Sequence, residues 1–150
     1  MYLLFLPPYT GGDIFANKDW RTILSRLAKY GYRPFISTKI PLTETDIKFL
    51  ISIGIREIQF SLDSIKEDEL FKIVKMSANY VKDAKRTLSL CDKYGIKLNI
   101  RSVLTKFNSS LESMNELFVE LNKHKSVYSW ILTPAFYSAY QCCPKRFYGQ

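Results

Sequence analysis

The sequence is poor in the residues from which many catalytic and metal sites are built. Its 150 residues include only 3 cysteines and 1 histidine. The cysteines show neither a CxxC spacing nor the pattern of a secreted disulfide framework. Cys91 falls on the apolar face of an expected helix and is assigned to the core, while the isolated pair Cys142 and Cys143 predicts no metal site without ligands from elsewhere. His124 is expected on the solvated surface rather than as a catalytic base.

Long apolar runs are also absent. No stretch approaches the roughly 18 apolar residues of a membrane-spanning helix. The apolar start, residues 1–6, is too short for a secretory signal and follows no basic residue. We therefore predict a cytoplasmic protein without a membrane partner. A hydrophobic content of 47% is sufficient for the core of one folded domain.

Acidic residues are outnumbered by basic ones, 14 to 22, and the formal net charge is +8. A positive chain attracts anions such as nucleic acids, phosphates or acidic peptides. The lysines are spread along the expected helices, without an arginine-rich run or a nucleic-acid motif. We interpret them as a solvated helix surface and predict no specific nucleic-acid partner. Attraction to an acidic partner is the alternative.

What the sequence does contain is an alternation of strands and helices. Strands are expected at residues 2–6, 34–37, 57–62, 97–105 and 127–132, with helices of amphipathic spacing between them. Gly31, Gly54 and Gly95 each end a helix and lead into a strand. Such repeated units imply right-handed crossovers and a mostly parallel sheet. We therefore predict an α/β fold of about five strands, either an open, curved half-barrel or a doubly wound sheet.

Polar residues at capping positions are expected to begin four of the helices. They are Asn17, Thr43 with Asp46, Ser64 with Glu67, and Ser109 with Glu112.

Three polar signatures follow apolar runs, at the carboxyl ends of expected strands. They are Gly11-Gly12-Asp13, Ser37-Thr38-Lys39 and Ser61-Leu62-Asp63. Parallel sheets bind ligands at that end, because the loops there open onto solvent. Each signature alone is also ordinary turn or helix-start chemistry. Together they predict one site assembled from several loops.

The order of these motifs resembles that of the radical S-adenosylmethionine enzymes. A Gly-Gly-acid segment follows one strand, a Ser-Thr pair ends the next, and residues 58–63 end the one after. Residues 98–108 look like that family's fifth strand and the loop behind it. The resemblance runs from about residue 3 to residue 134 and begins at the family's second strand. It implies an incomplete (β/α)6-type open barrel over residues 1–134, with helices on its outer face, followed by a tail or a further segment at 135–150.

The resemblance also implies a set of cofactor-binding residues. The amino group of S-adenosylmethionine would be contacted by Gly11, Gly12 and Asp13, and its ribose and carboxylate would lie near Ser37, Ser61, Asp63 and Arg101. A carboxylate suits an ammonium group, and a guanidinium suits a carboxylate. The sequence departs from the family at Asp13, where glutamate is usual, and at Lys39, where asparagine is common.

The family's cluster signature, CxxxCxxC, is absent from the sequence. Its three thiolates hold a [4Fe-4S] cluster, which in the family reduces S-adenosylmethionine to a 5′-deoxyadenosyl radical. We therefore expect a fragment of a longer iron–sulfur enzyme that acts on a peptide or a small molecule. The chain alone is expected to be inactive, with no catalytic residue, no metal ligand and neither cofactor bound.

Two alternatives to the enzyme fragment stay open. One is a degenerate family member that has lost its chemistry, and the other is a non-enzymatic α/β module that binds a peptide or protein partner. In the favoured fragment, the missing first strand and helix would leave an exposed sheet edge, which predicts self-association of the isolated chain.

Overall fold

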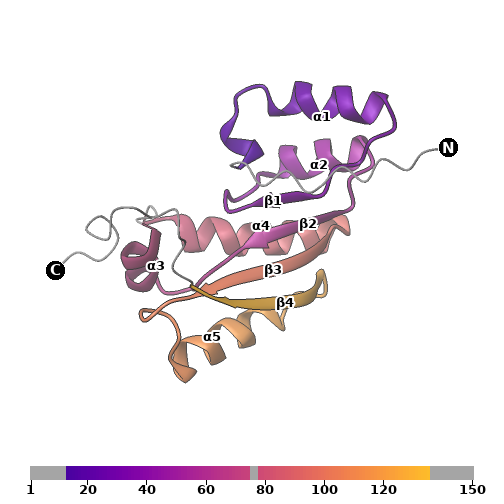
Figure 1. Cartoon of the computed structure of the whole chain (residues 1–150). Coiled ribbons are helices and arrows are strands. Elements are labelled where there is room, and N and C mark those ends of the chain that lie inside the picture. The colour runs from indigo at the N-terminus through magenta and orange to yellow at the C-terminus, as the bar shows by residue number, and fades with distance from the viewer. Residues whose placement is uncertain (1–12, 75–77, 136–150) are drawn as a thin grey trace, which may run out of the picture.

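The computed structural model describes residues 13–74 and 78–135. Its elements are a 3₁₀ helix η1 (Ile14–Ala16), then α1 (Trp20–Lys29), β1 (Ile36–Thr38), α2 (Glu44–Ser52), β2 (Glu57–Ser61), α3 (Glu67–Val74), α4 (Tyr80–Tyr94), β3 (Lys97–Leu104), α5 (Leu111–Leu121) and β4 (Val127–Pro134) (Figure 1). The strand expected at residues 2–6 and the tail beyond residue 135 lie outside the described residues.

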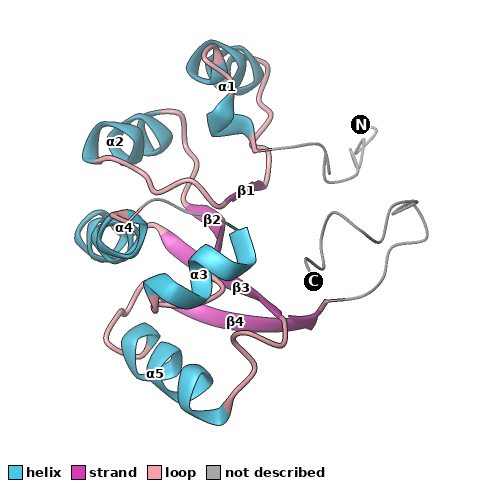
Figure 2. Ribbon diagram, turned by 90° about the vertical axis from the view of Figure 1, so that its left-hand side faces the viewer, coloured by secondary structure: helices cyan, strands magenta, loops and turns pink. Residues whose placement is uncertain are grey.

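The sheet runs β1-β2-β3-β4 in sequence order, and every neighbouring pair is parallel. Because this order never reverses, the right-handed crossovers place α2, α4 and α5 along the same face (Figure 2). The α/β prediction is confirmed, and the half-barrel holds rather than the doubly wound sheet. Four strands are described where about five were expected, since the first expected strand falls on residues 2–6.

Alternation along the strands separates an apolar outer face from a polar inner face. Ile58 and Phe60 of β2 and Ile100 of β3 are fully buried in a core that also includes Leu88 of α4. Closed barrels fill their interior with bulky apolar side chains. Here the opposite face carries hydroxyl, amide and guanidinium groups instead, from Ser37, Gln59, Ser61, Asn99 and Arg101. The inner face is therefore built for polar contacts rather than for packing.

Cys91 belongs to this core, as its helical position predicted. Its side chain is completely buried, and burial, aided by the nearby charge of Asp92, raises the pKa of the thiol to about 12. A thiol with so high a pKa is a poor nucleophile and a poor metal ligand at neutral pH.

The predicted cap of α2 is confirmed, whereas the cap of α1 lies two residues later than predicted. Thr43 Oγ1 accepts a hydrogen bond from the Asp46 amide at 3.3 Å, and Asp46 Oδ2 accepts one from the Thr43 amide at 2.9 Å. At α1, the cap residue is Asp19 rather than Asn17. Asn17 instead accepts from the Asp19 amide at 2.8 Å, so it shapes the turn before the helix.

The predictions for α3 and α5 were wrong in detail. Ser64 donates to the buried carboxylate of Glu69 at 2.6 Å instead of forming a capping box with Glu67. The cap of α5 is Ser110 rather than Ser109, one residue later than predicted. At α3 the hydroxyl is held by Glu69, whereas at α5 two adjacent serines stand at capping distance and Ser110 accepts from the Ser113 amide at 3.1 Å.

The expectation for His124 was also wrong. Its side chain is only 10% exposed, and Nδ1 lies 2.7 Å from Asp92 Oδ2. Asp92 Oδ1 also accepts from the Ser126 amide at 2.8 Å, so Asp92 ties the end of α4 to the turn before β4. Burial tends to raise the pKa of Asp92, but hydrogen bonds from Ser126 and His124 outweigh it and hold this pKa below its ordinary value.

This lowered pKa predicts a pH-dependent contribution to stability. A carboxyl whose pKa is lower in the folded state stabilises the protein above its unfolded pKa of about 4, and the contribution is lost as the pH falls through the folded value. We expect Asp92→Asn to lower the free energy of unfolding by about 1 kcal/mol at neutral pH. Urea unfolding of both proteins should show this difference shrinking below about pH 4. A difference that is the same at every pH would contradict the assignment.

No helix within residues 13–74 and 78–135 has the length and apolar character needed to cross a membrane.

Candidate functional site

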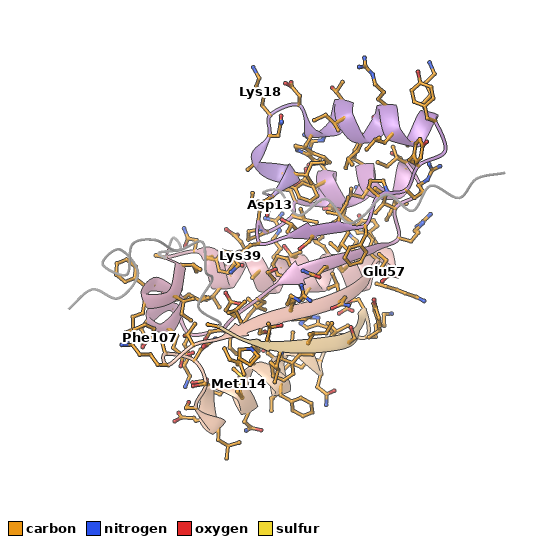
Figure 3. All side chains as sticks on the ribbon, in the orientation of Figure 1. Asp13, Lys18, Lys39, Glu57, Phe107 and Met114 are labelled. Atoms are coloured by element: carbon orange, nitrogen blue, oxygen red, sulfur yellow. The ribbon has the colours of Figure 1, made fainter. Side chains whose placement is uncertain are left out.

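The predicted site residues come from the carboxyl ends of neighbouring strands. Asp13 and Lys39 lie at this end of the sheet, whereas Glu57 lies at the amino end (Figure 3). Figure 2 looks onto the carboxyl end, with α3 in front of it. Gly11 and Gly12 lie outside the described residues, so the described part of the site begins at Asp13.

Asp13 connects the start of η1 to the end of β1. Oδ1 accepts from the Phe15 amide at 3.1 Å and caps η1. Oδ2 accepts from Thr38 Oγ1 at 2.7 Å and from the Lys39 amide at 2.8 Å. The carboxylate is thus held by uncharged donors, and Oδ1 has room for one further donor because a carboxylate oxygen accepts about two hydrogen bonds.

Asp63 connects the ends of β1, β2 and β3. It is 2% exposed, and its Oδ2 lies 2.6 Å from Lys39 Nζ. Oδ1 accepts from the Val103 amide at 2.8 Å, and the Asp63 carbonyl accepts from Asn108 Nδ2 at 2.7 Å. A buried carboxylate requires such partners. Both of its oxygens are therefore occupied by groups of the protein itself.

Tyr80, at the start of α4, contacts the backbone at the carboxyl ends of β1 and β2. It is buried, and its hydroxyl donates to the Lys39 carbonyl at 2.9 Å and lies 3.3 Å from the Ser61 carbonyl. Burial, followed by the charges of Asp63 and Asp13, raises the pKa of this phenol. The hydroxyl therefore stays protonated and keeps donating to the strand ends.

The inner face is arranged in rows across the strands. Ser37, Gln59 and Asn99 are register partners, and Gln59 Nε2 donates to Ser37 Oγ at 2.7 Å. The next row toward the carboxyl end pairs Ser61 with Arg101. The first row is neutral and polar, whereas the second carries a positive charge.

Arg101 is the charged group that this face leaves free. Its side chain is exposed and makes no ion pair with any residue that the structure describes. Ser61, its register partner, is half-buried. The pair therefore offers a hydroxyl and an open guanidinium side by side to a ligand on the inner face.

The structure brings Asp13, Asp63 and their partners together, but the sequence reasoning missed what connects them. Lys39 departs from the asparagine that is common in the family, yet its ammonium group is the direct partner of Asp63. Tyr80 and Asn108 were not singled out at all. The only signal for Asn108 was its place at the end of the fifth-strand segment. No pattern pointed to Tyr80 beyond its helical spacing.

The described part of the chain has a partial radical S-adenosylmethionine-type fold. Its structure resembles SuiB of Streptococcus suis with a TM-score of 0.69 at 17% identity, over 86% of this chain and 29% of SuiB. It also resembles TsrM of Kitasatospora setae, a radical S-adenosylmethionine methyltransferase solved with cobalamin and a [4Fe-4S] cluster bound. That match has a TM-score of 0.59 at 14% identity, over 82% of this chain and 25% of TsrM.

The chain thus spans between a quarter and a third of the length of these two proteins. No protein-family model matches the sequence, and no curated protein matches it either. Among the described residues, no three histidine, cysteine or acidic side chains gather where they could hold a metal ion. The similarity is therefore one of fold.

Proposed function

We propose that this chain is the cofactor-orienting part of a radical S-adenosylmethionine enzyme. The observation that supports this most is the placement of Asp13 at the carboxyl edge and of Ser61 and Arg101 on the open inner face, in a fold shared with a radical S-adenosylmethionine methyltransferase. A [4Fe-4S] cluster would be held by cysteines outside this sequence, because the CxxxCxxC spacing is absent. Reductive cleavage of the cofactor would be the chemistry that the cluster supplies.

Most of the predicted residues fit S-adenosylmethionine. Asp13 Oδ1 has room for an ammonium donor, and the free guanidinium of Arg101 suits the carboxylate of an amino acid. Ser37 and Ser61 present hydroxyls on the same face. Asp13 and Arg101 would hold the ammonium and carboxylate groups at the amino-acid end of the cofactor, and the ribose, on the other side of the sulfonium, would lie near the serine hydroxyls.

Asp63 fits this cofactor less well than the other residues. Direct contact with a ribose hydroxyl would require it to give up Lys39 or the Val103 amide. We propose instead that Asp63 acts through Lys39 as a positioning residue, because it fixes the end of β1 against β2 and β3. The substrate of the whole enzyme, a peptide or a small molecule, follows from the resemblance alone.

The isolated chain is not expected to hold either cofactor tightly, but the proposal predicts weak and specific contact with S-adenosylmethionine at high concentration. Without the cluster, we expect a dissociation constant in the millimolar range, on the order of 4 kcal/mol of binding free energy. In an NMR titration with S-adenosylmethionine, backbone amides near Asp13, Ser61 and Arg101 should shift. Arg101→Leu should weaken binding about tenfold, the usual scale for one charge-assisted hydrogen bond.

Two controls separate this site from general charge effects. Arg101→Leu should leave the binding of 5′-methylthioadenosine unchanged, because that compound lacks the carboxylate and the ammonium group. Arg56→Leu, at the amino end of the sheet, should leave the binding of S-adenosylmethionine unchanged. Amide shifts confined to any other surface would contradict the proposal and favour a binding module without this cofactor.

A further inference from the structure

The amino ends of the strands carry basic residues that form no ion pair with the residues that the structure describes. Each of the four strands has one of them at or just before its start, and a fifth ends α1; they are Arg33, Arg56, Lys97, Lys125 and Lys29. All five side chains are exposed, and within residues 13–74 and 78–135 none forms an ion pair. We call these residues and the loops that carry them the amino-end surface.

The loops of the amino-end surface form one continuous face. The Lys97 amide donates to the Arg56 carbonyl at 2.9 Å, and β3 and β4 are paired beside them. The Arg33 side chain lies against Gly54, where an added Cβ would come 2.7 Å from Nε. The loop before β1 therefore touches the loop before β2, and the loops that carry the basic residues lie next to one another.

The positive charge of this surface is only partly compensated. Lys48, Lys85 and Lys93, on the helices, pair with acidic side chains. At the amino end, Glu57 is the register partner of Lys97 and accepts from Tyr128, and Asp92 lies beside His124, so the basic groups outnumber these two carboxylates. Helix C-termini at this end favour nearby cations, which accounts for Lys29 and for Arg33, whose Nη1 donates to the Ala28 carbonyl at 3.1 Å, but not for Arg56 and Lys97 at strand starts.

Exposed aromatic side chains accompany these cations. Tyr30 is 73% exposed, Phe35 is 53% exposed and Tyr128 is 52% exposed. Tyr30 and Phe35 lie on the loop between α1 and β1, beside Arg33, and Tyr128 lies near the start of β4. Arginine with tyrosine and phenylalanine, and few free acidic groups, is the composition of protein-binding hot spots.

We infer that the amino-end surface docks an acidic surface of a partner protein. This inference is independent of the proposed cofactor site, which lies at the opposite end of the strands, as the positions of Glu57 and Lys39 show (Figure 3). A partner bound here would leave the carboxyl end open. Complementary charge would speed the encounter, and the exposed aromatic side chains would supply the buried contact.

A protein partner fits this end better than a nucleic acid does. Single-stranded nucleic acids are bound in a basic groove that follows the phosphate backbone, with bases stacked on aromatic platforms. The two hollows that the structure forms most clearly lie on α1 and between α3 and α4. Neither includes a residue of the loops before the four strands, so neither would guide a phosphate backbone onto this end.

The test uses a short polyglutamate peptide as a stand-in for an acidic protein surface. Its affinity for the full chain is measured by fluorescence anisotropy at low and at physiological salt. The triple variant Arg56→Glu, Lys97→Glu and Lys125→Glu should bind at least about tenfold more weakly at low salt. The matched variant Lys18→Glu, Lys82→Glu and Arg86→Glu changes the net charge equally, in exposed side chains away from this end, and should lose far less.

NMR mapping on the wild-type chain keeps the test decisive if a triple variant fails to fold. Peptide-induced shifts should fall on the loops before the four strands. Equal losses in the two triple variants, or shifts spread over the helices, would overturn the inference. Tighter binding of a polyuridine oligonucleotide, or of phosphatidylserine vesicles, at the same loops would assign the surface to a nucleic acid or a membrane instead. Failure here would leave the S-adenosylmethionine titration unaffected.

Discussion

Replacing Lys39 with methionine should lower the free energy of unfolding by about 3 kcal/mol, although the lysine side chain is 31% exposed. The cost arises on the other partner. Asp63 is 2% exposed, and without Lys39 its charge would keep only the Val103 amide as a donor. A buried carboxylate that loses its counterion is strongly destabilising, whereas an exposed lysine that loses its partner is not.

A double-mutant cycle tests this explanation. Asp63→Asn keeps an acceptor for Val103 and removes the charge, so it should cost about 2 kcal/mol alone. In the Lys39→Met background it should recover about 1 kcal/mol, because a neutral side chain needs no counterion. Urea unfolding of the four proteins should therefore show a coupling free energy of about 3 kcal/mol. Lys82→Met, an exposed lysine on α4 without an ion pair in the described part of the chain, is the control and should change stability by less than about 0.5 kcal/mol.

The fold was largely predictable because its signals are local. Gly31, Gly54 and Gly95 all adopt positive φ angles, of 83°, 82° and 70°, where glycine is favoured. Their repetition between amphipathic segments predicted parallel strands joined by helices. Periodicity does not encode strand order, so it left the choice between a half-barrel and a doubly wound sheet to the resemblance. The errors at Ser64 and Ser109 are of another kind, because spacing alone does not distinguish Ser109 from Ser110 or show that Ser64 is held by Glu69.

The site was less predictable than the fold, because its connections cross from one strand to another. Asp13 and Thr38 are 25 residues apart, and Lys39 and Asp63 are 24 residues apart. Such pairs become visible only once the register of the sheet is known. The sequence identified polar strand ends and assigned them to a ligand. The structure adds that Asp63, and most of Asp13, already bind groups of the protein itself, whereas Arg101 forms no ion pair with any part of the chain that is described.

The largest effect at the candidate site is expected from Asn108, which lies in the loop after β3 and is completely buried. Its Nδ2 donates to the Asp63 carbonyl at 2.7 Å and to the Val103 carbonyl at 3.0 Å. Its Oδ1 accepts from the amide and the hydroxyl of Thr105, at 2.7 and 2.9 Å. Asn108→Ala should lower the free energy of unfolding by about 4 kcal/mol, because it leaves several buried backbone groups without partners.

The comparison with Asn108→Asp separates hydrogen bonding from packing. Aspartate has the same size and keeps the acceptor for Thr105, but an ionised carboxylate cannot donate to the two carbonyls. Asn108→Asp should therefore be at least as destabilising as Asn108→Ala at neutral pH, and it should recover stability in acid as the carboxyl becomes protonated. Asn115→Ala, at an exposed position on α5, should change stability by less than about 0.5 kcal/mol. If Asn108→Asp were as stable as the wild-type protein, the two donated hydrogen bonds would not be what holds β3 against the end of β2.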